Sequence, residues 1–141
     1  MKFQWPGRSA ATPAVSRTTA AAPTARARGS AAEDAALAHL LAQGLQLVAR
    51  SYRTPGRGGG EIDLIVREAD GTLVFVEVRA RANASRGGAA ASVGATKQAR
   101  LVLAAQHYLL RHHHSPPRCR FDVVAMDGPH IEWLKAAFDA G

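Results

Sequence analysis

The chain has 141 residues, of which 47% are hydrophobic, and it carries a net charge of +7 with a single cysteine. This length allows one domain, and one cysteine excludes an intramolecular disulfide and a cysteine-based zinc cage. The sequence contains no apolar run of 18 residues and no signal-peptide core, so we expect no membrane span and a cytoplasmic protein.

The first 29 residues differ in composition from the remainder. They carry five basic side chains and no acid, whereas residues 30–141 carry 13 basic and 11 acidic side chains. Ala, Thr, Ser, Pro and Arg dominate this first segment, which predicts a disordered basic tail. We therefore expect one α/β domain over residues 30–141. Most of the positive charge lies outside that domain, so the net charge alone does not indicate nucleic-acid binding.

A helix is predicted to begin at Ser30. Ser30 suits the N-cap, and Glu33 three residues later completes a capping box. The helix has an apolar stripe formed by Ala36, Leu37, Leu40 and Leu41. Gly44 is expected to end it, and a strand follows over residues 45–52.

A glycine-rich loop at residues 54–60 leads into two strands, at 61–66 and 73–79, joined by a short turn at 68–71. One face of both strands is aliphatic, which predicts a central, covered hairpin. That face is expected to consist of Ile62, Leu64, Val66, Val74, Val76 and Val78.

Charged residues interrupt these strands. The turn sets a register in which Asp63 lies opposite Glu77 and Glu61 lies opposite Arg79. Like charges that face each other across strands are destabilising unless a cation lies between them. Two carboxylates and a backbone carbonyl suit Mg²⁺ or Mn²⁺. The alternative is that these charges mark strand ends that reach solvent.

The C-terminal half adds a loop at 80–94, a helix at 96–113, strands at 120–126 and 130–134, and a short helical end at 135–140. Lys97 lies in the first turn of the helix, where a cation is disfavoured by the helix dipole, so we expect it to serve an anionic group such as a phosphate. Asp122 faces away from its neighbours Phe121 and Val123, either towards the site or towards solvent.

These segments resemble the YraN family of bacterial proteins, which is similar to archaeal Holliday-junction resolvases and to the PD-(D/E)xK nuclease superfamily. The matching motifs are AAED at 31–34, GEIDLI at 60–65, VFVEVRAR at 74–81, TKQ at 96–98 and RFDVV at 120–124. The resemblance covers about residues 29–138 and implies a three-layer α/β/α restriction-endonuclease-like core with a mixed central sheet.

The resemblance also implies roles for individual residues. Asp63 and Glu77 match the metal-binding acids, and the Val78 carbonyl assists them. Glu33 matches an additional acid of resolvase-like members. Arg79 stands where the superfamily usually has lysine, and an arginine cannot take up a proton at neutral pH.

Three functions of different kinds remain open at this stage. The first is Mg²⁺- or Mn²⁺-dependent endonuclease activity on DNA, including branched DNA, with Arg79 stabilising phosphate charge. The second is a non-catalytic nucleic-acid-binding protein with a degenerate nuclease site. The third is a structural adaptor whose acids are locally salt-bridged. The similarity to resolvases also implies that a homodimer can form. The residues expected to bind nucleic acid are Arg53, Arg57, Arg81, Arg86, Lys97 and Arg100.

Overall fold

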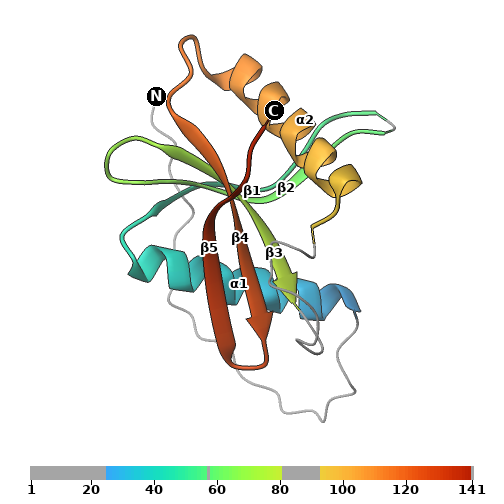
Figure 1. Ribbon diagram of the computed structural model, residues 1–141, viewed down its shortest axis with the longest axis vertical. Helices are drawn as coiled ribbons and strands as arrows, with labels where there is room; N and C mark the ends of the chain where they lie inside the picture. The colour runs from blue at the N-terminus through green and yellow to red at the C-terminus, as the bar shows by residue number, and fades with distance from the viewer. Residues whose placement is uncertain (1–24, 57, 81–92, 141) are drawn as a thin grey trace, which may run out of the picture.

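The computed structural model describes residues 25–56, 58–80 and 93–140, and it shows a five-stranded sheet between two helices (Figure 1). The elements are α1 (Ala25–Ala42), β1 (Gln46–Arg53), β2 (Glu61–Arg67), β3 (Leu73–Ala80), α2 (Ala95–His112), β4 (Cys119–Asp127) and β5 (His130–Phe138). The strands follow chain order across the sheet; β3 and β4 are parallel and the other neighbours are antiparallel. The predicted three-layer α/β fold with a mixed sheet is confirmed, and it is compatible with a restriction-endonuclease-like core.

Each face of the sheet packs against one helix, because successive strand residues point to opposite faces. On one face, Ile65, Phe75 and Val123 pack with the buried side of α2, which presents Leu101, Ala104, Ala105 and Tyr108. On the other face, Leu64, Val76 and Val124 pack with Ala36 and Leu40 of α1. The acids of interest therefore lie in the central strands of a sheet that is covered on both sides.

Helix α1 begins earlier than the sequence indicated. It starts at Ala25, so Ser30 is an interior residue and its predicted role as N-cap is wrong. The end is as predicted: the Leu45 amide donates to the Leu40 carbonyl (3.2 Å), and Gly44 has a φ of 98° that a residue with a Cβ rarely adopts. Residues 1–24 of the tail predicted over residues 1–29 lie outside the described residues, and residues 25–29 belong to α1.

The hairpin of β2 and β3 has the predicted register, with Leu64 opposite Val76 and Arg67 opposite Leu73. Its turn is closed by the Gly71 amide, which donates to the Glu68 carbonyl (2.9 Å). One detail of the predicted facing is wrong. Ile62 packs with the α2 cluster, whereas Leu64 packs with the α1 cluster, so the strand changes its facing at Asp63.

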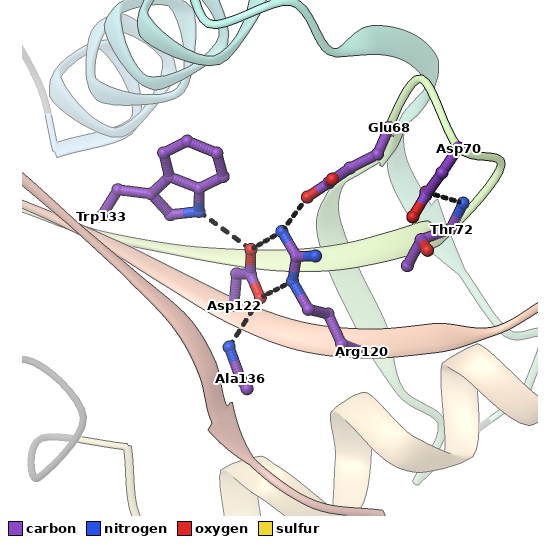
Figure 2. A network of polar contacts seen from close by, with 7 residues as sticks. All are labelled: Glu68, Asp70, Thr72, Arg120, Asp122, Trp133 and Ala136. Atoms are coloured by element: carbon purple, nitrogen blue, oxygen red, sulfur yellow. Dashed lines mark hydrogen bonds and ion pairs between the residues drawn. The ribbon is translucent and has the colours of Figure 1, made fainter.

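The C-terminal segment is a strand and not the predicted helical end, since β5 continues to Phe138. Its irregular point lies near Ala136, which has a φ of 51° and whose amide donates to the Asp122 carboxylate (2.9 Å). Asp122 also accepts from Arg120 (2.9 and 3.1 Å) and from the Trp133 indole (2.8 Å), as Figure 2 shows. Arg120 in turn pairs with Glu68. Asp122 is fully buried, and its hydrogen bonds to Trp133 and Ala136 hold β5 on the sheet.

Neither α1 nor α2, the helices of the described ranges, is long and apolar enough to cross a membrane.

Candidate active site

Asp63 and Glu77 come together where the regular pairing of β2 and β3 ends. The ladder runs up to Leu64 and Val76, one residue before the two acids. Beyond that point the Val78 amide donates to Oδ2 of Asp63 (2.8 Å), and the Asp63 carboxylate lies close enough to Glu77 to raise its pKa. One Asp63 oxygen is therefore engaged by the backbone of β3, and the carboxyl groups of the two strands meet, as their register predicts.

The backbone beside Asp63 is irregular. The pairs Arg50 with Leu64 and Tyr52 with Ile62 place Ser51 of β1 across from Asp63. Ser51 has a φ of 51°, in the left-handed region that few residues other than glycine adopt. Backbone strain of this kind often lies near functional sites. The change of facing at Asp63 occurs at this position.

Burial dominates the electrostatics of Glu77. Its side chain is on the α2 face of β3 and the residue is only 4% exposed. Desolvation, followed by the negative charge of Asp63, raises the pKa of Glu77 to about 7, and Lys97 and Arg79 oppose this shift. A carboxyl group with this pKa is partly protonated at neutral pH, and a cation placed beside it would favour the ionised form.

Two cations approach Glu77 from different elements. Arg79 of β3 and Lys97 of α2 each place a nitrogen 3.5 Å from Oε2 of Glu77. Both distances exceed the 2.7–2.9 Å or so of a charge-assisted hydrogen bond. Lys97 was expected to serve an anionic group such as a phosphate, and in the structure an anionic group near it is the Glu77 carboxylate. The sequence could not reveal this contact, because the two residues are 20 positions apart and the packing of α2 on the sheet brings them together.

Glu33 lies at the edge of the acid pair. Burial and the charge of Asp63 raise the pKa of Glu33, so α1 places it within electrostatic range of the pair. Its side chain also faces Arg50 of β1 (3.6 Å), which forms a closer ion pair with Asp34 (2.9 Å). Because Ser30 is not the N-cap, the capping-box role that the sequence offered for Glu33 is wrong.

Glu61 does not extend the acid pair. The register places it opposite Arg53 of β1, and the two side chains form an ion pair of 3.5 Å. Both are largely exposed, so this pair contributes little to stability.

Three of the six predicted nucleic-acid-binding residues line one pocket. Arg53, Lys97 and Arg100 surround a cavity of about 280 Å³ together with Glu61 and the glycine-rich loop between β1 and β2. The other three predicted residues, Arg57, Arg81 and Arg86, lie outside the described residues.

The donor set defines which ion would fit. Within residues 25–56, 58–80 and 93–140, no three His, Cys, Asp or Glu side chains converge as a complete metal-binding group. What the strands provide is a carboxylate pair, beside which Glu33 is a more distant acid. Mg²⁺ usually retains several waters and is held by one or two carboxylates with substrate phosphates. The Asp63–Glu77 pair and the Val78 carbonyl fit this ion better than one that requires a cage of side chains.

Comparison with known proteins places the chain in a family. The model of "Uncharacterised protein family UPF0102" matches residues 32–126. The chain belongs to the UPF0102 family. It is 68% identical over 118 residues to a UPF0102 protein of Paracidovorax citrulli, covering 84% of this chain and 87% of the relative. It is 64% identical over 122 residues to one of Acidovorax sp. (strain JS42), covering 86% and 92%.

The UPF0102 match contains the whole candidate site. Glu33, Asp63, Glu77 and Lys97 all lie within residues 32–126, as does Asp122. The match ends before β5, which supplies two of the partners of Asp122. The YraN-type resemblance of the motifs is thereby confirmed at the level of the family.

Proposed function

We propose that the protein is a metal-dependent endonuclease-like enzyme that acts on phosphodiester bonds of DNA, with branched DNA among its substrates. The observation that carries this proposal is the carboxyl pair at the end of the β2–β3 ladder: the buried Glu77 lies beside Asp63, whose charge raises its pKa, and Arg79 and Lys97 each lie 3.5 Å from Glu77. A buried acid next to a second, half-buried acid is unfavourable for stability alone, which supports a role in binding a cation.

Asp63, Glu77 and the Val78 carbonyl would hold Mg²⁺ or Mn²⁺, and Glu33 would orient a water molecule from the α1 side. When bound, such an ion lowers the pKa of a coordinated water and neutralises charge on the phosphate. The Val78 amide, by binding Oδ2, would fix the orientation of the Asp63 carboxylate.

The remaining residues of the site would act on the phosphate. Arg79 and Lys97 both present positive charge beside Glu77, where it would stabilise the additional negative charge of the transition state. Arginine in place of the superfamily's lysine leaves the strand without an amine, and Lys97 brings one to the same carboxylate from α2. The site would therefore contain both a guanidinium and an amine.

The test is cleavage of labelled four-way-junction, flap, single-stranded and duplex DNA in Mg²⁺ and in Mn²⁺. We expect wild-type protein to cleave at least one substrate, and Asp63→Ala and Glu77→Ala to abolish cleavage while the proteins remain folded. Glu132→Ala, which removes an exposed acid of β5, is the matched control and should cleave like wild type. Equal cleavage by wild type and both site variants would refute the proposal.

A second candidate function rests on Arg79 alone. If arginine at this position has silenced the site, the protein would bind nucleic acid without cleaving it. Arg79→Lys distinguishes the two, because restoring the lysine would produce cleavage from an inactive protein. Salt-sensitive DNA binding without cleavage in wild type, together with cleavage by Arg79→Lys, would support this second function.

A further inference from the structure

A basic pocket adjoins the acid pair and has no role in holding the metal. It lies between the β1–β2 loop and the first turns of α2, and its charged lining residues are Arg53, Glu61, Lys97 and Arg100. Its volume of about 280 Å³ leaves room for a phosphate group. Three cations against one carboxylate give it a positive character.

The two walls of this pocket are held together by Gly60. Its amide donates to Oγ1 of Thr54 (2.8 Å) and its carbonyl accepts from the Thr54 amide (3.1 Å), which closes the loop. Gly60 is buried against α2, where a Cβ atom would collide with the Arg100 carbonyl and approach the Ala104 amide. The loop therefore packs directly on the helix backbone, which sets the spacing of the two walls that carry the cations.

Lys97 connects the pocket with the acid pair. The same side chain that lies 3.5 Å from Glu77 also lines the pocket. A ligand in the pocket would therefore be next to a phosphodiester held at Asp63 and Glu77. The carboxylate of Glu61 is already paired with Arg53, but both side chains are largely exposed and the pair is weak, so a phosphate can compete for Arg53.

Building on the proposed function, we infer that this pocket is a second phosphate subsite, which binds a backbone phosphate of the nucleic-acid strand beside the scissile one. Arg53 and Arg100 bind this phosphate from the two walls, and Lys97 lies between it and the acid pair. The subsite fixes the path of the strand from the end of the β2–β3 ladder, across α2, towards the β1–β2 loop.

The test measures binding of a fluorescently labelled DNA duplex and of a labelled four-way junction in the presence of EDTA. Fluorescence anisotropy gives the affinity at several salt concentrations. Arg53→Gln and Arg100→Gln should each weaken binding roughly tenfold, because each loses a charged hydrogen-bonding group. Each should also reduce the slope of log K against log salt by about 1. Glu61→Gln should strengthen binding, since it removes the carboxylate that competes for Arg53.

Arg111→Gln is the matched control, because it removes an exposed arginine from the last turn of the same helix. It lies 11 residues beyond Arg100, or about 16 Å along the helix axis. Its affinity and salt slope should stay near those of wild type. Equal losses in Arg100→Gln and Arg111→Gln would overturn the inference, because they would indicate a general effect of charge.

A second arm identifies the source of the phosphate. Inorganic phosphate at millimolar concentration should compete only weakly with DNA. Saturable binding of inorganic phosphate in the absence of DNA binding would overturn the inference in favour of a free-anion site. All binding is measured without a divalent ion, so it does not depend on cleavage. If the protein cleaves no DNA but its DNA binding still depends on Arg53 and Arg100, only the nuclease proposal is refuted.

Discussion

Glu77 and Asp122 are buried acids on neighbouring strands with opposite surroundings. Asp122 is fully buried and accepts four hydrogen bonds of 2.8–3.1 Å from Arg120, Trp133 and Ala136. Glu77 instead lies beside another acid, Asp63, whose charge raises its pKa, and its two cations remain 3.5 Å away. The parallel register pairs Val76 with Asp122 and Glu77 with Val123, so the two acids point to opposite faces of the sheet.

Asp122 and Glu77 show two different reasons for burying a carboxylate. Donors supplied by the protein surround Asp122, so its charge serves to join β4 and β5. At Glu77 the protein supplies fewer and more distant donors, and the neighbouring acid makes ionisation harder. A group kept in this state is suited to a partner from outside the chain, such as a cation.

The largest effect is expected for Asp122→Ala. This change leaves the Arg120 charge, the Trp133 indole and the Ala136 amide without their acceptor, and the unfolding free energy should fall by about 3–5 kcal/mol. Urea denaturation at pH 7 measures it. Asp139→Ala, which removes an exposed acid near the chain end, should stay within about 0.5 kcal/mol of wild type. A loss below about 1 kcal/mol for Asp122→Ala would remove the distinction between the two acids.

The opposite result is expected for Glu77→Gln. A pKa raised from 4.5 to about 7 means that the ionised carboxylate destabilises the folded state above pH 7. Each pKa unit corresponds to about 1.4 kcal/mol, so replacing the charge at pH 8 should stabilise the protein by up to roughly 3 kcal/mol without divalent ions. Destabilisation on the scale of Asp122→Ala would show that Glu77 is a structural acid.

The pH dependence of wild-type stability follows from the same shift. Between pH 4.5 and 7 the unfolded chain has lost the Glu77 proton while the folded protein still holds it. The unfolding free energy should therefore fall as the pH rises through this window, and it should not change with this group below it. Glu77→Gln should flatten that part of the curve, measured by urea denaturation at each pH. A wild-type curve that rises through the window and is unchanged by Glu77→Gln would contradict the assignment.

The smallest effect is expected for Lys97→Met. Lys97 is partly exposed, so removing its ion pair should change stability by at most about 1 kcal/mol. It should raise the pKa of Glu77 further, because the charge of Lys97 opposes the shift. The descending part of the stability curve should accordingly extend to higher pH. A curve that coincides with wild type would show that Lys97 does not act on Glu77 in solution.

Local patterns predicted the central hairpin and its acid pair well. Asp63 and Glu77 lie on strands joined by a four-residue turn, so alternation and turn length were sufficient to set their register. The same reasoning predicted α2 within one residue at each end, because its apolar face has a clear helical period.

Features that depend on contacts between distant segments were not predicted. The Ala-rich end at 135–140 has helical propensity, but pairing with β4 and the hydrogen bond from Ala136 to Asp122 make it a strand. The start of α1 was missed because Ser30 and Glu33 form a good capping pattern inside a longer helix. The approach of Lys97 to Glu77 depends on how α2 packs on the sheet, which has no local signal.

The metal centre is tested most directly by calorimetric measurement of Mn²⁺ binding at pH 8. The proteins compared are wild type, Asp63→Asn, Glu77→Gln and the exposed-site control Glu132→Gln. We predict one Mn²⁺ bound by wild type and by Glu132→Gln, and none by either variant of the acid pair. Unchanged Mn²⁺ binding by Asp63→Asn and Glu77→Gln, or its absence from wild type, would contradict the claim that these two acids form a metal centre.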